Sequence, residues 1–344
     1  MMRLPHFRYR APSTVDEAAA MLADDPGARL LAGGTDLLPN MKRRQETPKT
    51  LIALRGVESM RTIENGDGLS VGGAVTLTEL CRDDRVRTHY PALFQAAIQV
   101  ASPHLRNSAT LGGNLCLDTR CHYYDQTWEW RRSIDFCMKK DGEICWVAPA
   151  SKRCLAISST DAAPALIALG AKVALHSKQD GTREVALADL YRNDGIDYLT
   201  RRPDEILTAV RLEAATGWRS AYWKLRRRGS FDFPVLGAAA AVRTAVDGTV
   251  EAARIVLGAV SSQPVVCDAA ADGLVGQQLT DAAIAEAGAQ AGRKAKPMDN
   301  ADFTLHWRKR VAAEFVGYAL REVRGDDLSE TRKRVARHEL APPV

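Results

Sequence analysis

The pattern of hydrophobic and polar positions predicts a first helix close to the N-terminus. Thr14 and Glu17 have the spacing of a capping box, in which a hydroxyl and a carboxylate bind the free amides of a helix's first turn. The apolar residues 18–22 follow directly, and Pro26 ends the pattern. We therefore expect a short helix between Thr14 and Pro26.

Strands and helices alternate along the rest of the chain without a repeat of fixed period. Short apolar runs next to turn-forming residues predict strands at residues 28–32, 51–54, 69–74, 172–176, 205–212, 238–244 and 254–260. Apolar segments with helical spacing predict helices at residues 91–100, 165–171, 280–294 and 306–323. We expect a domain junction at residues 217–220 and an independent α+β domain beyond it.

Residues 118–154 interrupt this pattern. They have no apolar periodicity, yet they contain three of the six tryptophans and four of the seven cysteines: Trp128, Trp130, Trp146, Cys121, Cys137, Cys145 and Cys154. A segment of this composition cannot bury enough apolar surface to offset its ordering entropy. We interpret it as an insertion that something else, such as a bound metal, must hold in place.

The composition is that of a globular protein. The chain has 344 residues, of which 46% are hydrophobic and 26% charged, so two or three domains are expected and extensive disorder is not. The net charge is +5, and the most basic stretch, residues 321–337, also contains acidic residues. Such a mixed run is typical of a solvated helix face, and we expect no nucleic-acid partner.

The N-terminal residues lack the apolar core of a signal peptide, and no window approaches the roughly 18 apolar residues of a membrane span. We therefore expect a cytoplasmic protein without a membrane partner. Disulfides are rare in that compartment, so the seven cysteines need another explanation.

Two glycine-rich segments have the properties of phosphate-binding turns. Each follows an apolar run and combines two glycines with a threonine: Ala32-Gly33-Gly34-Thr35-Asp36 and Thr110-Leu111-Gly112-Gly113-Asn114. Glycine allows close approach of the backbone, and consecutive N–H groups in a turn form an anion-binding nest. Neither segment is a Rossmann fingerprint or a P-loop. A pyrophosphate site is the functional interpretation, and two ordinary turns are the alternative.

The four cysteines of the insertion are candidate metal ligands. They are separated by 15, 7 and 8 residues, without the Cys-x-x-Cys pairs of a zinc ribbon or a bacterial ferredoxin. Four thiolates can nevertheless bind one [4Fe-4S] cluster, one sulfur to each iron, whatever the loop lengths between them. An iron–sulfur cluster, a zinc ion and four unrelated thiols all remain open at this point.

Several short motifs extend over nearly the whole chain. They are Pro5-x-Phe7-x-Tyr9-x-x-Pro12-x-Thr14-x-x-Glu17-Ala18, both Gly-Gly segments, Asp161-x-x-Pro164-Ala165-Leu166 and Arg228-x-Ser230-x-Asp232-Phe233-Pro234. Together they resemble the FAD-binding medium subunit of the molybdenum hydroxylases, the xanthine oxidase and carbon monoxide dehydrogenase group. The implied fold is α+β, with a two-part FAD-binding domain of the PCMH (vanillyl-alcohol oxidase-like) type followed by a C-terminal α+β domain as in CO dehydrogenase flavoprotein subunits.

The resemblance also implies a division of the chain. The FAD-binding domain would cover residues 1–217, with lobes at about 1–55 and 56–217 and an iron–sulfur insertion at 118–156. The C-terminal flavoprotein domain would cover residues 218–325, followed by a basic tail at 326–344.

Cofactor-binding residues are implied by position within these motifs. The candidates for FAD are Leu30, Leu31, Ala32, Gly33, Gly34, Thr35, Asp36 and Leu37 at the pyrophosphate, Thr110, Leu111, Gly112, Gly113 and Asn114 beside the phosphates and the isoalloxazine, Asp161 at the adenosine half, and Leu207 and Lys224 near the flavin ring. The structural alternatives are a helix cap for Asp161 and a solvated strand-edge charge for Lys224. No residue of this chain is expected to be catalytic.

The insertion departs from typical members, which run directly from the second Gly-Gly segment to the Asp161-type motif. It is similar to the β subunit of 4-hydroxybenzoyl-CoA reductase, which carries an additional [4Fe-4S] cluster. By this resemblance Cys121, Cys137, Cys145 and Cys154 are the cluster ligands.

The implied function is electron transfer within a molybdenum enzyme. Electrons would pass from ferredoxin through [4Fe-4S] and FAD to [2Fe-2S] clusters on a small partner and molybdopterin on a large partner, in a dimer of heterotrimers that converts 4-hydroxybenzoyl-CoA to benzoyl-CoA. One alternative is the FAD subunit of an oxidative molybdenum hydroxylase with NAD or oxygen as acceptor. Another is a zinc-stapled interaction module without flavin.

Overall fold

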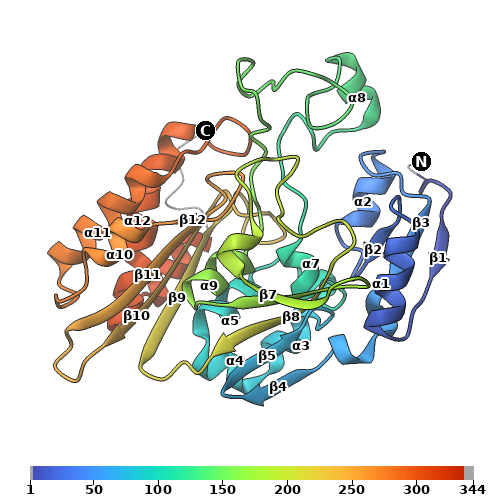
Figure 1. Ribbon diagram of the computed structural model, residues 1–344. Coiled ribbons are helices and arrows are strands. Elements are labelled where there is room, and N and C mark those ends of the chain that lie inside the picture. The colour runs from blue at the N-terminus through green and yellow to red at the C-terminus, as the bar shows by residue number, and fades with distance from the viewer. Residues whose placement is uncertain (1–2, 337–344) are drawn as a thin grey trace. The chain divides into compact units, whose positions relative to one another are not determined.

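The computed structural model describes residues 3–336, which divide into two units. The first contains the described residues up to 80 together with residues 103–156 and 170–214. The second contains residues 81–102, 157–169 and those from 215 onward (Figure 1). Within residues 3–336, no helix is long and apolar enough to cross a membrane.

A small parallel sheet forms the N-terminal part of the first unit. Its strands are β1 (Arg8–Arg10), β3 (Thr50–Ala53) and β2 (Arg29–Leu31), in that order, with helices α1 (Val15–Asp24) and α2 (Leu37–Lys42). The Thr14 hydroxyl accepts from the Glu17 amide at 3.1 Å, and the Glu17 carboxylate accepts from the Ser13 amide at 2.8 Å. The predicted capping of the first helix is thus confirmed.

The second sheet of this unit is antiparallel. Its order is β4 (Ile63–Gly66), β5 (Gly68–Gly72), β8 (Ile206–Glu213), β6 (Lys172–Ser177) and β7 (Gly181–Ala186). The predicted hairpin is β4–β5, and the predicted strands 172–176 and 205–212 are β6 and β8. Short helical elements complete the unit: η1 (Leu54–Gly56), η2 (Glu58–Met60), α3 (Leu77–Arg82), α6 (Pro103–Arg106), α7 (Leu111–Leu115), α8 (Trp128–Ser133) and η3 (Leu187–Leu190).

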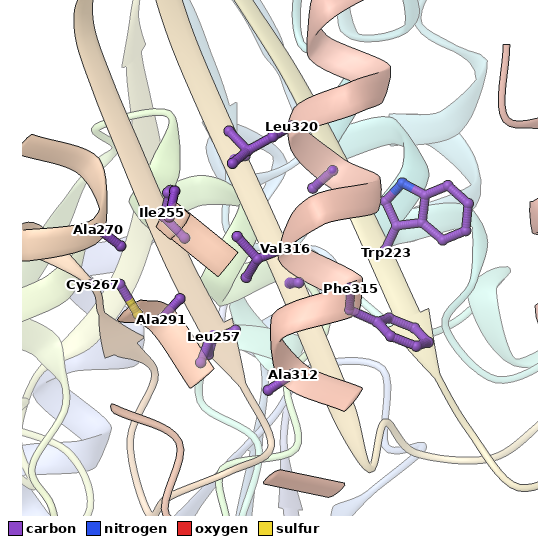
Figure 2. Close-up of a cluster of buried hydrophobic side chains, with 14 of the residues drawn as sticks. Trp223, Ile255, Leu257, Cys267, Ala270, Ala291, Ala312, Phe315, Val316 and Leu320 are labelled. Carbon is purple, nitrogen blue, oxygen red and sulfur yellow. The ribbon is translucent and has the colours of Figure 1, made fainter. Parts of the chain in front are cut away.

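The second unit is built on an antiparallel sheet of β12 (Val265–Val266), β11 (Val250–Gly258), β10 (Leu236–Thr244) and β9 (Trp218–Leu225). Its helices are α4 (Asp84–His89), α5 (Pro91–Ile98), α9 (Ala162–Ala168), α10 (Asp268–Asp272), α11 (Asp281–Lys294), α12 (Leu305–Arg324) and α13 (Ser329–Ala336). In Figure 2, Val316 and Leu320 of α12 lie against Ile255 and Leu257 of β11. The four alanines 238–241 of β10 are fully buried because helices contact both faces of this strand.

The predicted basic tail contains helix α13, most of whose side chains are exposed, but Arg332 and Val335 attach it to the second unit. Arg332 donates to Glu322 at 2.5 Å and lies over the Trp223 ring, 4.1 Å from its centroid. Val335 is buried in the core of the unit. Residues 337–344 of the predicted tail lie outside the described residues.

Candidate cofactor site

The two glycine-rich segments lie against each other in the first unit. A Cβ atom added to Gly33 would be 1.9 Å from the carbonyl oxygen of Ser108, just before the second segment. A Cβ atom on Gly113 would be 3.8 Å from that of Ala32. Only glycine at position 33 permits this close approach. The two segments thus lie together in the structure although more than seventy residues separate them in the sequence.

The backbone amides of the two segments differ in what they already bind. In the second segment, Gly112 donates to Gly73 at 2.9 Å, and Gly113 donates to the Thr110 hydroxyl at 3.1 Å. Among residues 3–336, by contrast, no group accepts a hydrogen bond from the backbone amide of Gly33 or Gly34. The first segment therefore has amides available to an anion such as a pyrophosphate, whereas the amides of Gly112 and Gly113 are already used within the fold.

A short line of backbone contacts connects the second segment to strand β8. Gly73 accepts from Gly112, and its own amide donates to the carbonyl oxygen of Thr208 at 2.7 Å. A Cβ atom on Gly73 would be 2.4 Å from the carbonyl oxygen of Leu207. Leu207, the predicted apolar flavin contact, is thereby placed one glycine away from the second segment, with its side chain buried.

The insertion is attached to the first glycine-rich segment by an ion pair. Arg120 contacts the carboxylate of Asp36 and donates to Asp125 at 2.9 Å. The second oxygen of Asp125 accepts from the amide of Cys121 at 3.0 Å. Arg120 is buried, so these contacts are shielded from solvent.

Two further buried side chains hold the insertion to the residues after α2. The Gln45 amide donates to the carbonyl oxygen of Tyr124 at 2.5 Å, and Arg131 donates to the carbonyl oxygen of Arg43 at 3.2 Å. Helix α8 is the insertion's only helix, and Figure 1 shows it apart from both sheets of its unit. The insertion has only a small apolar cluster of its own. It depends on contacts with α2 and its flanks and with the loop at residues 193–195. In that loop, Asn193 accepts from Arg153, and the Gly195 amide donates to the carbonyl oxygen of Cys154.

The four predicted ligand cysteines are buried. Their exposed fractions lie between 4% and 7%, and none forms a disulfide: Cys121, Cys137, Cys145 and Cys154. Three of them belong to one apolar cluster with Tyr124, and Cys145 acts electrostatically on Cys154. Burial raises the pKa of the Cys121 thiol to about 12 and that of Cys154 to about 11, and neighbouring thiols add to both shifts. Without a metal, the thiols of Cys121 and Cys154 therefore stay protonated at neutral pH.

The thiols are not arranged around one ion. Within residues 3–336, no three histidine, cysteine, aspartate or glutamate side chains form a group that holds a metal ion. A tetrahedral zinc site would require its sulfurs to lie about 4 Å from one another, whereas the thiolates of a cluster bind different irons and lie farther apart. The described side chains as they stand form no zinc site, and their arrangement does not by itself show a cluster.

Asp161 and Lys224 form a buried ion pair in the second unit. The Lys224 ammonium donates to Asp161 at 2.9 Å and to the carbonyl oxygen of Gln99 at 3.0 Å, and the Tyr222 hydroxyl donates to the other Asp161 oxygen at 2.9 Å. Burial raises the pKa of Asp161 and lowers that of Lys224, while their mutual attraction opposes both shifts.

This pair corrects both structural alternatives. Asp161 stands at the N-cap position of α9 but makes no side-chain capping bond, and Lys224 is a core residue rather than an exposed edge charge. Their contacts with FAD remain predictions.

Sequence reasoning missed the polar residues that attach the insertion, above all Arg120 and Arg131. They belong to no motif. The available signal was the presence of arginines in a segment that needs external support, but their partners Asp36 and Arg43 are far away in sequence.

Known families match both parts of the chain. Residues 5–213 match the family described as "FAD binding domain in molybdopterin dehydrogenase", and residues 220–323 match "CO dehydrogenase flavoprotein C-terminal domain". The aldehyde oxidoreductase FAD-binding subunit PaoB of Escherichia coli is 35% identical over 268 residues, which are 75% of this chain and 82% of PaoB. The carbon monoxide dehydrogenase medium chain of Afipia carboxidovorans is 28% identical over 310 residues, or 89% and 92% of the two chains.

Solved structures agree with these matches. A chain of the reconstituted CO dehydrogenase from Oligotropha carboxidovorans superposes with a TM-score of 0.78 and 26% identity, covering 95% of this chain and all of that one. Fold and sequence together define an FAD-binding oxidoreductase subunit. The chain belongs to the family of FAD-binding medium subunits of molybdenum hydroxylases, and the predicted family and fold class are confirmed.

Proposed function

We propose that this chain is the electron-transfer subunit of a molybdenum enzyme that binds a [4Fe-4S] cluster in addition to FAD. The observation that carries the proposal is the burial of four cysteines within the insertion, three of them in one apolar cluster and none in a disulfide. Their burial suits a cluster, whose iron withdraws the thiol protons that the apolar surroundings otherwise retain.

The two cofactors would be held by different parts of the first unit. The open amides of residues 33–34 would bind the FAD pyrophosphate, with Leu207 against the flavin, and the four cysteines would ligate the cluster. FAD supplies one- and two-electron transfer and the cluster supplies one-electron transfer. The chain's residues would bind and orient these groups. The flavin contacts of Asp161 and Lys224, which belong to the second unit, stay predictions from the sequence motifs.

The proposed partners are a molybdopterin-containing large subunit and a [2Fe-2S] small subunit in a dimer of heterotrimers, with ferredoxin as electron donor. The proposed overall reaction is the reductive removal of the phenolic hydroxyl of 4-hydroxybenzoyl-CoA, which gives benzoyl-CoA and water. The additional cluster supports inward electron flow because a one-electron donor needs a one-electron entry point.

A second candidate is an oxidative molybdenum hydroxylase subunit. The matched relatives are named aldehyde oxidoreductase and carbon monoxide dehydrogenase subunits, and these names favour electron flow from substrate to an acceptor. With NAD or oxygen as acceptor, FAD alone can pass the electrons on, so this candidate needs no additional cluster.

The deciding experiment is the content of iron, zinc and acid-labile sulfide per flavin in anaerobically purified protein. We expect about four irons and four sulfides per FAD, as in one cubane cluster. Flavin without iron would contradict the cluster and favour the oxidative candidate, and one zinc per chain would make the insertion a structural staple.

Two variants separate the cofactors. Cys137→Ser is expected to remove the iron and leave most FAD bound, because the cysteine pocket and the glycine-rich segments are different sites. Cys267→Ser is the control, since Cys267 is a buried cysteine of the second unit whose contact with the Val265 carbonyl a serine can keep. Turnover of 4-hydroxybenzoyl-CoA by the assembled enzyme with reduced ferredoxin then tests the substrate and the donor.

A further inference from the structure

A buried lysine lies within the insertion, two residues after Cys137. The side chain of Lys139 is 6% exposed. Its ammonium donates to the Asp118 carboxylate at 2.8 Å, to the Thr119 hydroxyl at 2.8 Å and to the carbonyl oxygen of Gly195 at 2.6 Å. All three donor positions of the ammonium are therefore used, and its place is fixed.

Two tyrosine rings complete the surroundings of this ammonium. It lies 4.7 Å from the ring centroid of Tyr124 and 5.5 Å from that of Tyr198. Cation–π attraction of this kind strengthens when the charge is desolvated. The ammonium is thus largely buried together with its partner Asp118, at a place where a neutral side chain would avoid the cost of burying a charge.

Gly195 connects this ammonium to the cysteine pocket. Its carbonyl oxygen accepts from Lys139, while its amide donates to the carbonyl oxygen of Cys154 at 2.9 Å. A Cβ atom on Gly195 would lie 2.6 Å from the Sγ atom of Cys154. A single residue without a side chain therefore separates the charge from a predicted cluster ligand.

We propose that Lys139 is the fixed counter-charge of the cysteine pocket and raises the reduction potential of the cluster bound there. This inference rests on the proposed [4Fe-4S] cluster. Reduction adds one electron and breaks no bond, so the negative charge of the four-thiolate site increases by one. A positive charge at short range in a low-dielectric pocket favours that state. Asp118 offsets part of the charge of Lys139, while only Gly195 lies between the ammonium and Cys154.

The test is a redox titration of the anaerobically purified full-length protein with its partner subunits, followed by the EPR signal of the reduced cluster. Lys139→Met removes the charge and keeps the length of the side chain. We expect the equilibrium constant for reduction of the cluster in this variant to be at least tenfold lower than in wild type. A tenfold change corresponds to a fall in midpoint potential of about 59 mV. Lys139→Arg keeps the charge and should stay near the wild-type value. Lys140→Met is the control, because Lys140 is the next residue and its side chain is 39% exposed.

The outcomes separate the inference from the function on which it rests. Wild-type protein without iron would overturn the proposed cluster before any variant is compared. A cluster whose potential is the same in wild type and Lys139→Met would overturn the counter-charge alone. If Lys139→Met loses its iron, the redox titration is done with Lys139→Gln instead, because glutamine keeps hydrogen-bonding groups. Iron loss from both neutral variants, with retention in Lys139→Arg, also supports the counter-charge.

Discussion

Asp36 and Arg120 join the first glycine-rich segment to the cysteine insertion through a largely buried ion pair. Arg120 also binds Asp125, which accepts from the amide of Cys121, so a continuous set of polar contacts runs from the proposed pyrophosphate site to the first proposed cluster ligand. The two proposed cofactor sites are therefore linked by direct polar contacts, although no sequence motif relates them.

Loss of Arg120 should loosen the insertion. Arg120→Met leaves two carboxylates, Asp36 and Asp125, without their buried partner, and removal of one member of a buried pair costs roughly 3 kcal/mol or more. We expect a lower unfolding midpoint and faster proteolysis within residues 118–154, with iron lost before FAD. The exposed Lys152→Met is the matched control. Wild-type protease resistance in Arg120→Met would show that the ion pair does not hold the insertion.

The capping of α1 and the β4–β5 hairpin were predictable because each depends on residues only a few positions apart in the sequence. The attachment of the insertion was not, because Asp36 and Arg120 meet only after the chain has folded. Local patterns identify an unsupported segment, but they do not identify the distant surface that supports it.

A methyl group at position 33 should separate the two glycine-rich segments. In Gly33→Ala the new Cβ atom would lie 1.9 Å from the carbonyl oxygen of Ser108, so the backbone at Ser108 would have to move. Backbone shifts of this kind cost about 1–3 kcal/mol. We expect FAD to bind at least tenfold more weakly in a fluorescence titration of deflavinated protein. Gly66→Ala is the control, because a Cβ atom there meets no other atom within 4 Å. Equal affinities of both variants would argue against a flavin role for this contact.

The close approach of Gly195 to Cys154 should make alanine at that position incompatible with the cluster. The added methyl group would lie 2.6 Å from the sulfur and 2.9 Å from the Cβ atom of Ala156. We expect Gly195→Ala to lose most of its iron and sulfide while FAD content changes little, measured on the same preparation. Gly66→Ala serves again as the control. Full iron content would mean that the sulfur moves freely away from Gly195.

Lys224 shows a different limit of sequence reasoning. It precedes three consecutive arginines, a context typical of an exposed edge, yet its side chain is in the core of the second unit. Alternation along β9 does not reveal this burial, because both faces of the strand are covered. Resemblance singled out Asp161 and Lys224 separately, and only the structure shows that they bind each other.

The Asp161–Lys224 pair should be strongly coupled in a double-mutant cycle. Lys224→Met leaves the buried Asp161 carboxylate without its cation, and Asp161→Leu leaves the buried Lys224 ammonium without its anion. Each substitution should therefore lower the free energy of unfolding by about 3–5 kcal/mol. The double variant should be less destabilised than the sum of the two, as judged by chemical denaturation. The absorption spectrum of bound FAD, recorded in parallel, tests the proposed flavin contact of Lys224. Additive losses would contradict the ion pair as a stabilising unit.

Glu205 should make the first unit sensitive to acid. Its buried carboxylate accepts from Arg183 at 2.9 Å and from the Arg202 amide at 2.7 Å. Burial alone would raise the pKa of Glu205, but these hydrogen bonds and the charges of both arginines outweigh it, and the pKa lies below its ordinary value of 4.5. A carboxyl with a lowered pKa in the folded state contributes stability above pH 4.5 that is lost as the pH falls through the folded-state pKa.

The measurement is the unfolding midpoint from pH 7 downward. We expect Glu205→Gln to be less stable than wild type at pH 7 by about 1–3 kcal/mol, since a charge-assisted contact is lost. Below pH 4.5 the difference should shrink, because the wild-type carboxyl is then protonated as well. Glu64→Gln, at an exposed position of β4, should follow the wild-type curve throughout. If the difference in stability between Glu205→Gln and wild type is the same at every pH, the destabilisation comes from the changed shape of the side chain and not from its charge. Because Glu205 directly precedes β8, where Leu207 lies, the same loss should also weaken FAD binding.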